Sequence, residues 1–355
     1  MTKAVCITDE KLASLKGLID PAEKIAVISH MNPDGDAVGA CAAMSSFLRE
    51  YLGKKDVTVV LPDAPGEPLS FVTTLIPKLM VGRRDPEAAA KAIESAGAVF
   101  VVDLNRLERT SVLEQAVRLA AAPKVLIDHH PGPEEEPFSL VFSEVNVSSA
   151  CELIYHILTR ICGGAAKLPA DCATALMCGM TTDTNNFANS VHPGTLKMAS
   201  ELLEAGVDRE SIIDHLYRSE RPNRLEAQGD MLSNRMHLLP GGVACTVLDA
   251  SFLERHSMRE GETEGFVNLP LTVKDIRLSV LAREDTDFFR VSVRSKKGIS
   301  ARALARDFFH GGGHEQAAGG RIYIPADVAS ADQVQSYIER ISARFMQEDA
   351  SAVKQ

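Results

Sequence analysis

The first half of this 355-residue chain alternates short runs of β-branched and apolar residues with longer runs of helical spacing. The strand-like runs are KIAVISH, VTVVLP, AVFVVDL and KVLIDHH, and helical apolar spacing marks segments between them such as residues 36–53 and 86–97. Strands that alternate with helices are typical of a parallel sheet wrapped by helices. The sequence therefore predicts an α/β fold with a parallel sheet for the N-terminal half.

The second half has a different pattern of predicted elements and begins after a polar stretch, RSERPNRLEAQGD. The strand-like runs VACTVLDA, IRLSVLARED and FFRVSVRS follow each other closely, before a helical run and a last strand, RIYIP. A chain of this length is expected to hold two domains. We predict a domain at residues 1–218, a linker at 219–240, and a smaller α/β domain at 241–355 across a cleft.

Composition narrows the function classes. A formal charge of -10 argues against a protein that coats long nucleic acid, because such binding needs many contacts from Lys and Arg to phosphates. We find neither a membrane-spanning run nor a secretory signal in the first twenty residues, so we expect a cytoplasmic protein. The seven cysteines, from Cys6 to Cys245, include no CxxC pair and are expected to be reduced thiols.

Acidic and imidazole side chains follow several of the predicted strands. In an open parallel sheet the loops that leave the carboxyl ends of the strands gather at one edge, where ligands bind. The residues expected at this edge, from the first strand through to a turn after a later helix, are His30, Asp34, Asp36, Asp103, Asp128, His129, His130 and Asp183.

Any one aspartate at a strand end is more often a turn former or a helix cap. Five carboxylates that converge without a cation would repel one another, and a pair of divalent ions removes that repulsion. Oxygen-rich ligands with a minority of imidazole suit Mn²⁺, with Mg²⁺ as the alternative. Two such ions ~3.5 to 4 Å apart can hold a hydroxide and stabilise both the attacking and the leaving oxygen in a displacement at phosphorus.

These segments together resemble a known family. The stretch HMNPDGDAVGA, the strand-end Asp103, the tripeptide DHH at 128–130 and TTDTNNF resemble the four motifs of the DHH phosphoesterase superfamily in order and spacing. The stretch GGGHEQAAGG resembles the signature of its DHH-associated C-terminal domain. The resemblance covers nearly the whole chain, and it is specific because five separated motifs agree.

The resemblance implies how two divalent ions are held. One metal is bound by His30, Asp34 and Asp103, and the other by Asp36, Asp103, His129 and Asp183, so that Asp103 bridges the two ions. Asp128 is then expected to orient an imidazole, which metal-bound histidines commonly require. His130 is expected to face the substrate phosphate, as a charge stabiliser or as a proton donor to the leaving oxygen.

A second candidate site lies near the C-terminus. The glycines Gly311, Gly312 and Gly313 allow a close approach of backbone to a ligand, although the run by itself could equally be a turn. The resemblance implies a substrate loop in which His314 reaches across the interdomain cleft to a phosphate. Arg294 and Ser295 match the family's Arg-Ser pair, and the planar guanidinium of Arg294 suits a terminal phosphate better than the lysines that follow it.

The superfamily includes several activities. RecJ-type exonucleases carry additional nucleic-acid-binding domains, membrane-bound cyclic-dinucleotide enzymes carry spanning helices, and family II pyrophosphatases lack the GGGH loop. The chain is most similar to stand-alone enzymes that degrade oligoribonucleotides (nanoRNases) and remove phosphate from 3′-phosphoadenosine 5′-phosphate. We therefore expect a hydrolase in which a metal-bridging hydroxide attacks phosphorus.

Two alternatives stay open at this point. One is a phosphodiesterase acting on cyclic or linear dinucleotides, and the less favoured one is a nucleotide sensor without turnover. The expected partners are short RNA oligonucleotides or phosphorylated nucleotides, with no long duplex nucleic acid and no membrane. A homodimer is neither required nor excluded by the sequence.

Overall fold

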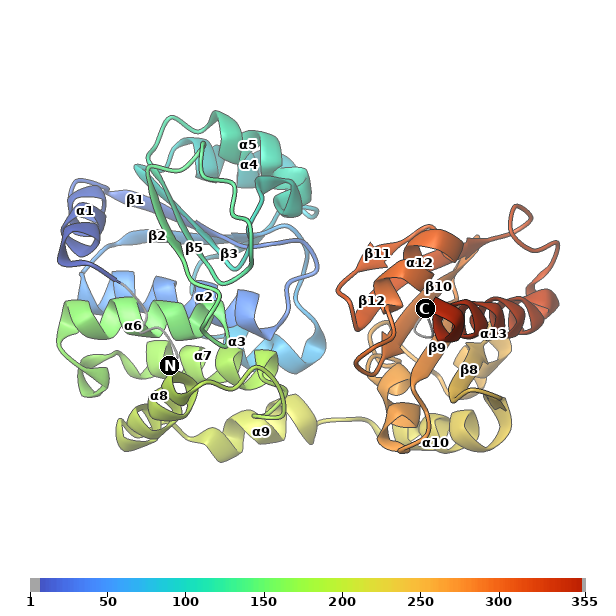
Figure 1. The fold of residues 1–355 in the computed structure, drawn as a ribbon. Helices are drawn as coiled ribbons and strands as arrows, with labels where there is room; N and C mark the ends of the chain where they lie inside the picture. Colours follow the sequence, from blue (N-terminus) through green and yellow to red (C-terminus); the bar gives the residue numbers. More distant parts are fainter. Residues whose placement is uncertain (1–6, 353–355) are drawn as a thin grey trace. The chain divides into compact units, whose positions relative to one another are not determined.

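The computed structural model describes residues 7–352, and the chain divides into two compact units, Met1–Ser219 and Glu220–Gln355. Each unit is built around its own sheet (Figure 1). The α/β fold class, with a parallel sheet in the N-terminal unit and a second sheet in the C-terminal unit, is confirmed. Among residues 7–352, every helix is too short or too polar to span a bilayer.

The N-terminal sheet has the strand order β3-β2-β1-β4-β5-β6, and all of its pairings are parallel. From the central strand β1 the chain first builds outward through β2 and β3, and then returns to build β4, β5 and β6 on the other side. The strand bounds are β1 (Lys24–Ile28), β2 (Asp56–Leu61), β3 (Leu79–Val81), β4 (Ala98–Val102), β5 (Lys124–Asp128) and β6 (Leu140–Ser143).

Helices cover both faces of this sheet, with α2, α6 and α7 on one face and α4 and α5 on the other (Figure 1). The strand β1 shows why: Ile25 and Val27 pack into the first core, while Ala26 and Ile28 pack into the second. A parallel strand buried on both faces needs apolar residues at successive positions. The helices are α1 (Asp9–Ile19), α2 (Gly35–Ser46), α3 (Ser70–Thr73), α4 (Pro86–Glu94), α5 (Glu114–Leu119), α6 (Ala150–Cys162), α7 (Ala170–Asp183), α8 (Pro193–Glu204) and α9 (Arg209–Tyr217).

The C-terminal sheet has the order β11-β12-β10-β9-β8-β7 and is mixed, because β8 and β9 are parallel while the other pairs are antiparallel. The helices α12 and α13 pack into a core on one face, and α10, α11 and a 3-10 segment at Phe266–Thr272 pack on the other. The bounds are β7 (Met236–Leu239), β8 (Val243–Leu248), β9 (Leu278–Glu284), β10 (Phe288–Ser295), β11 (Gly312–Gly313), β12 (Ala317–Tyr323), α10 (Pro222–Asp230), α11 (Ala250–Arg255), α12 (Ala301–Phe308) and α13 (Val334–Ala352).

Residues 220–240 of the stretch 219–240, predicted as a linker from the sequence, belong to the second unit. They contribute α10, a π-helical turn at Met231–Arg235 and the edge strand β7. The Arg221 guanidinium donates to both carboxylate oxygens of Glu262 at 2.6 and 2.7 Å, which ties the start of α10 to this unit. Two polar residues of the stretch, Arg221 and Arg224, form ion pairs with Glu262 and Glu220.

The cysteines of the described residues are free and buried. Burial raises the pKa of several of these thiols, including Cys41, Cys151 and Cys172, so they are held protonated in the core. This agrees with the expectation of reduced thiols for six of the seven positions. Cys6 lies outside the described residues.

Candidate active site

The carboxyl ends of three adjacent strands meet at the point where the sheet changes direction of growth. Strand β1 is paired with β2 on one side and β4 on the other, and β5 follows β4. At such a switch point the loops from neighbouring strands diverge and leave a crevice for a ligand. His30 follows β1, Asp103 follows β4, and Asp128 ends β5.

The turn after β1 places two aspartates with different tasks. Asp34 is the N-cap of α2, because its Oδ1 accepts hydrogen bonds from the backbone N–H groups of Asp36 and Ala37 at 3.1 and 3.0 Å. Asp36 lies in the first turn of the same helix. A carboxylate has two oxygens, so Asp34 can cap the helix with one and bind a ligand with the other.

Asp36 is fully buried and is held by another helix. Its Oδ2 accepts from the backbone N–H of Ala150 at 2.6 Å, and its Oδ1 accepts from that of Cys151 at 3.0 Å. These donors belong to the first turn of α6, where backbone N–H groups lack intrahelical partners and favour negative charge. Gly179 in α7 leaves room for this contact, since a Cβ there would lie 2.9 Å from Asp36 Oδ1.

Asp103 lies at the centre of the site. Its Oδ2 is 3.3 Å from Nε2 of His30, and its Oδ1 is 3.6 Å from Nε2 of His129. The His30 ring is oriented by its Nδ1, which lies 2.8 Å from the carbonyl oxygen of Met31. Asp103 also has a left-handed backbone, with φ 57°, a conformation that aspartate tolerates better than most residues and that is concentrated at functional sites.

His129 is surrounded by carboxylates. Besides Asp103, its Nε2 lies 3.4 Å from Oδ2 of Asp183 and 4.0 Å from Oδ2 of Asp36. Asp183 is the last residue of α7, rather than a residue of the turn that follows it. The spacing of these donor atoms is close to the ~3 Å that separates neighbouring ligands of an octahedral ion bound at ~2.1 Å.

We call His30, Asp34, Asp36, Asp103, His129 and Asp183 the carboxylate–imidazole cluster. Two groups within it have ligand atoms all within 4.8 Å of one another: one is His30, Asp34 and Asp103, and the other is Asp36, His129 and Asp183. A third such group is Asp103, His129 and His130. The structure therefore brings together, from three strand ends and one helix end, all six residues that the sequence analysis assigned to metal binding.

Burial and the repulsion between carboxylates change the pKa values of groups in the cluster. Burial raises the pKa of Asp36 well above its ordinary value, and the charges of Asp103 and Asp183 add to this. Burial likewise raises the pKa of Asp183 to about 6, although His129 opposes the shift. For His129 burial lowers the pKa, but Asp103 and the neighbouring carboxylates outweigh it and raise the value to about 9. Protons therefore balance part of the charge of the bare cluster.

This donor set fits divalent cations. Asp103 Oδ1 is buried and has no hydrogen-bond partner within the described residues, whereas buried carboxylate oxygens are normally satisfied. A cation next to Oδ1 would satisfy it and would also remove the repulsion between Asp36, Asp103 and Asp183. Oxygen ligands with two imidazoles match Mn²⁺ or Mg²⁺ better than a soft thiolate site.

Asp128 and His130 lie beside the cluster. The fully buried Asp128 accepts from the backbone N–H of His130 at 3.1 Å through Oδ2, and its Oδ1 lies 2.8 Å from Nδ1 of the same ring. Asp128 therefore orients His130, and not the imidazole of His129. On the other side of the ring, Nη1 of Arg109 lies 3.4 Å from Nε2. Arg109 was missed in the sequence analysis, because an arginine in a predicted helix carries no signal of its own.

In the C-terminal unit the predicted substrate residues gather at one end of the sheet. Arg294 in β10 is half-buried, and its Nη1 donates to the carbonyl oxygens of Val293 and Ala318 at 3.0 and 3.3 Å. Ala318 pairs with Gly313 of β11, and the exposed His314 follows directly. The guanidinium thus lies next to the glycine loop.

The glycines of that loop are required by close backbone contact. A Cβ at Gly311 would lie 1.9 Å from the carbonyl oxygen of Gly319, and Gly313 has φ 140°. Ser295 is buried and donates its hydroxyl to the carbonyl oxygen of Ile299 at 2.6 Å, which indicates a role in shaping the turn. His310 lies beside the loop, with Nε2 2.9 Å from Oδ1 of Asp327.

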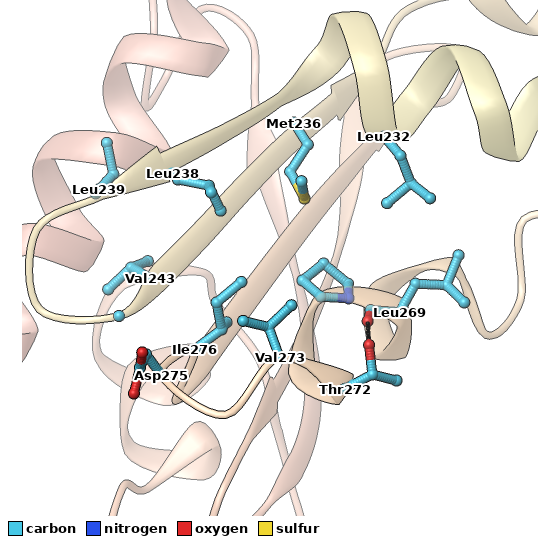
Figure 2. Close-up of a pocket in the computed structure, with 12 residues that line it drawn as sticks. Leu232, Met236, Leu238, Leu239, Val243, Leu269, Thr272, Val273, Asp275 and Ile276 are labelled. Carbon is cyan, nitrogen blue, oxygen red and sulfur yellow. Dashed lines mark hydrogen bonds between the residues drawn. The ribbon is translucent and has the colours of Figure 1, made fainter.

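A pocket of about 560 Å³ opens elsewhere in the C-terminal unit, beside the edge strand β7. Figure 2 shows that its walls are mostly apolar, with Met236, Leu238, Val273 and Ile276 projecting into the same space. It lacks the convergent charged groups that phosphate chemistry requires. The pocket is therefore distinct from the candidate active site.

The comparison with protein-family models covers both units. Residues 24–180 match the model described as "DHH family, N-terminal domain", and residues 242–346 match the "DHHA1 domain" model. The chain contains a DHH-family N-terminal domain and a DHHA1 domain. The prediction of this family from five short motifs is thereby confirmed, and the carboxylate–imidazole cluster lies in or just beyond the matched DHH domain, with Asp183 three residues past its end.

Several named relatives align with most of the chain. The "Bifunctional oligoribonuclease and PAP phosphatase NrnA" of Bacillus subtilis is 29% identical over 296 residues, which cover 83% of this chain and 88% of the relative. The protein of the same name from Thermus thermophilus is also 29% identical, with 83% of each chain covered. A crystal structure of an exopolyphosphatase-related protein from Bacteroides fragilis has a TM-score of 0.88 at 28% identity, covering 98% of this chain and 100% of that one.

Proposed function

We propose that this DHH-family protein is a metal-dependent phosphoesterase that hydrolyses short oligoribonucleotides, 3′-phosphoadenosine 5′-phosphate (PAP), or both. The observation that carries the proposal is the carboxylate–imidazole cluster around Asp103, built from three adjacent strand ends and the end of α7. The names of the B. subtilis and T. thermophilus relatives, at 29% identity over most of the chain, support the substrate class.

We assign the ligands of two divalent ions, with Mn²⁺ as the first choice and Mg²⁺ as the second. His30, Asp34 and Asp103 would hold one, and Asp36, Asp103, His129 and Asp183 the other, with Asp103 shared. When bound, such ions supply Lewis acidity and lower the pKa of water, which produces a nucleophile for phosphorus at neutral pH.

The protein's own groups supply position and charge. The first turn of α6 holds Asp36 through two backbone N–H groups, and the Met31 carbonyl fixes the ring of His30. His130, oriented by Asp128, would face the phosphate and stabilise the charge that develops on its oxygens. Groups that the protein holds in place act without reorganising during the reaction.

We further assign Arg294, Ser295, Gly311, Gly312, Gly313 and His314 to substrate binding. The half-buried Arg294 has only carbonyl acceptors within the described residues, so its guanidinium remains free to form a bidentate contact with a phosphate. The exposed backbone of Gly312 and Gly313 adds N–H donors that suit an anion. A substrate held by its terminal phosphate in this way would be short, which fits an exoribonuclease or a nucleotide phosphatase.

Activity measurements on the purified full chain test the proposal. With Mn²⁺ present, we expect release of phosphate from PAP and of mononucleotides from di- to pentaribonucleotides, with rates that fall for longer RNA. Chelation by EDTA should abolish both activities, and Mn²⁺ added back should restore them. Absence of turnover on every short substrate, with Mn²⁺ demonstrably bound, would contradict the proposal.

A second candidate is a phosphodiesterase acting on cyclic or linear dinucleotides. It is favoured by one relative, the "Cyclic-di-AMP phosphodiesterase GdpP" of Geobacillus thermodenitrificans, which is 29% identical over 219 residues, or 58% of this chain and 33% of the relative. Cyclic di-AMP and its linear form, included in the same assay, distinguish the two. A kcat/KM on cyclic di-AMP above that on PAP and short RNA would favour this second function.

The proposal includes a cytoplasmic location. It rests on the free, buried cysteines of the described residues, which are usual for proteins of reducing compartments. Fractionation of the source cells with an antibody to the protein would test it.

A further inference from the structure

One arginine of the DHH domain lies beside the candidate active site without an acidic partner. Arg109 belongs to the 3-10 segment Leu107–Leu113, which follows Asp103, and its Nη1 lies 3.4 Å from Nε2 of His130. Within residues 7–347 its guanidinium forms no ion pair with a carboxylate.

The backbone of Arg109 is tied to the turn that carries His30. Its carbonyl oxygen accepts a hydrogen bond from the N–H of Met31 at 2.7 Å. The carbonyl of Met31 in turn orients His30 through Nδ1 at 2.8 Å. Arg109 is therefore connected to the candidate active site twice, by its main chain to His30 and by its side chain to His130.

The rest of the segment is anchored as well. Ser111 has an uncommon backbone conformation, with φ 51° and ψ -114°, and its hydroxyl accepts from Nη2 of Arg83 at 3.3 Å. Arg83 pairs with Asp63, which follows β2 and also accepts from the N–H of Asn32 at 2.8 Å. Strained backbone that is held by its surroundings is concentrated at functional sites, because it fixes a side chain in place.

The contact with His130 leaves most of the guanidinium's capacity unused. With Nδ1–H donating to Asp128, Nε2 of His130 can accept one hydrogen bond, whereas a guanidinium has five N–H donors. The ligand that best matches several donors of a planar cation is a phosphate with two or three free oxygens. A long contact of 3.4 Å to a ring nitrogen is easily exchanged for such a ligand.

We propose that Arg109 binds the oxygens of the phosphate group that is hydrolysed, next to His130. This inference rests on the proposed function and deepens it, because it gives the DHH domain a cationic group of its own for the reacting phosphate. The guanidinium gives up its contact with the ring nitrogen of His130 when it binds the phosphate.

The kinetic test compares Arg109→Ala and Arg109→Lys with Arg106→Ala. Arg106 is exposed and belongs to the same loop, so it is a matched control for surface charge. Arg109→Ala should lower kcat/KM on PAP by about 10²–10³-fold, the usual effect of losing one donor to transition-state charge. Arg109→Lys should recover part of the loss, and Arg106→Ala should stay within about twofold of wild type, as expected for surface substitutions.

Two further measurements separate substrate contact from a structural role. Arg109→Ala should keep the wild-type Mn²⁺ content and Tm, and guanidinium ion added to the assay should restore part of its activity. The inference is overturned if Arg109→Ala stays within about twofold of wild type, the limit set for surface substitutions. It is also overturned if the loss of activity is explained by lost Mn²⁺ or unfolding and guanidinium does not restore it.

Binding of inorganic phosphate makes the test independent of turnover. With Mn²⁺ bound, wild-type protein should bind phosphate in isothermal titration calorimetry more tightly than Arg109→Ala, by about tenfold or more for a charge-assisted contact. If wild type hydrolyses no short substrate, the proposed function fails, while weaker phosphate binding by the variant would still support the role of Arg109. Equal affinities, or no binding by wild type, would overturn it.

Discussion

The two candidate sites of this protein differ in the sign of their charge and in how deeply their side chains are buried. In the N-terminal unit, His30, Asp36 and Asp103 are each no more than 5% exposed, and Asp103 is far from the other two in the sequence. In the C-terminal unit the glycine loop and His314 are exposed, and Arg294 donates to the backbone carbonyls of Val293 and Ala318. Buried carboxylates require cations, whereas an exposed cationic loop is stable in water until an anion arrives.

This difference separates the consequences of substitution. Changes in the carboxylate–imidazole cluster should alter metal binding first and activity as a result. Changes in the glycine loop and at Arg294 should alter substrate binding while metal content stays constant.

Replacing Asp103 should have the largest effect, because it belongs to two of the three groups that could hold an ion. Asp103→Asn keeps the volume but removes the charge, so bound Mn²⁺ should fall and kcat on short substrates should drop by about 10³-fold or more. Metal content by mass spectrometry and steady-state rates measure this. Asp85→Asn is the control, since Asp85 caps α4 through Ala88 and asparagine is an equally good cap. Unchanged metal content and rate in Asp103→Asn would refute the site.

Replacing Arg294 should lower activity without changing the amount of bound metal. Arg294→Met removes the guanidinium at the glycine loop and should lower kcat/KM by about 10²-fold through lost phosphate contacts, with bound Mn²⁺ unchanged. Lys297→Met is the matched control, because Lys297 is exposed at the neighbouring turn. Lys296 is unsuitable for this purpose, since its Nζ donates to the carbonyls of Val273 and Lys274. Loss of metal from Arg294→Met would break the separation between the two sites.

Much of the N-terminal site could be predicted from the sequence, for a topological reason. Parallel strands end at the same edge, so residues that follow KIAVIS, AVFVV and KVLI must lie together once those runs are recognised as strands. Asp183 was different, because it comes from the end of a helix, and the order of the strands alone does not place a helix end. The division of residues between two ions likewise came from the resemblance, and it remains a proposal.

What could not be predicted depends on contacts rather than on local pattern. The short strands β3 and β6 are partly exposed edges of three and four residues, which leaves little periodicity to recognise. Residues 107–113 have helical spacing but form a 3-10 segment, because Ser111 adopts φ 51° there. Arg109 acquires its place from that local geometry, which its sequence position does not reveal.

Gly179 packs against the N-terminal site so closely that a larger residue should not fit there. A Cβ at Gly179 would lie 2.3 Å from Sγ of Cys151 and 2.9 Å from Oδ1 of Asp36. Gly179→Ala should therefore destabilise the protein by about 1–3 kcal/mol through overpacking. Gly17→Ala in α1 is the matched control, since a Cβ there meets nothing within 4 Å and alanine should stabilise the helix by about 0.5–1 kcal/mol. Urea unfolding of both variants measures their free energies of unfolding. If both variants were stabilised or both were destabilised, the packing argument would be contradicted.

The smallest effect concerns Glu262 in the C-terminal unit, far in sequence from either site. Its hydrogen bonds from Arg221, helped by the backbone N–H of Arg259, lower its pKa from the ordinary 4.5 to about 2. A carboxyl whose pKa is depressed on folding stabilises the protein above the unfolded pKa, and the contribution is lost as pH falls through the folded value. Glu262→Gln should therefore reduce the free energy of unfolding at pH 7 by about 1 kcal/mol or less.

The difference between wild type and Glu262→Gln should shrink as pH is lowered from about 5 to about 2, because unfolded Glu262 takes up a proton across this range and the folded carboxylate only at its lower end. Urea midpoints at a series of pH values measure it, and the other carboxyls cancel because they titrate in both proteins. Glu260→Gln is the control, since Glu260 is 80% exposed and its 3.7 Å contact with Arg290 should contribute nothing measurable. A difference that stays constant down to pH 2 would mean that the Arg221 pair does not stabilise the second unit.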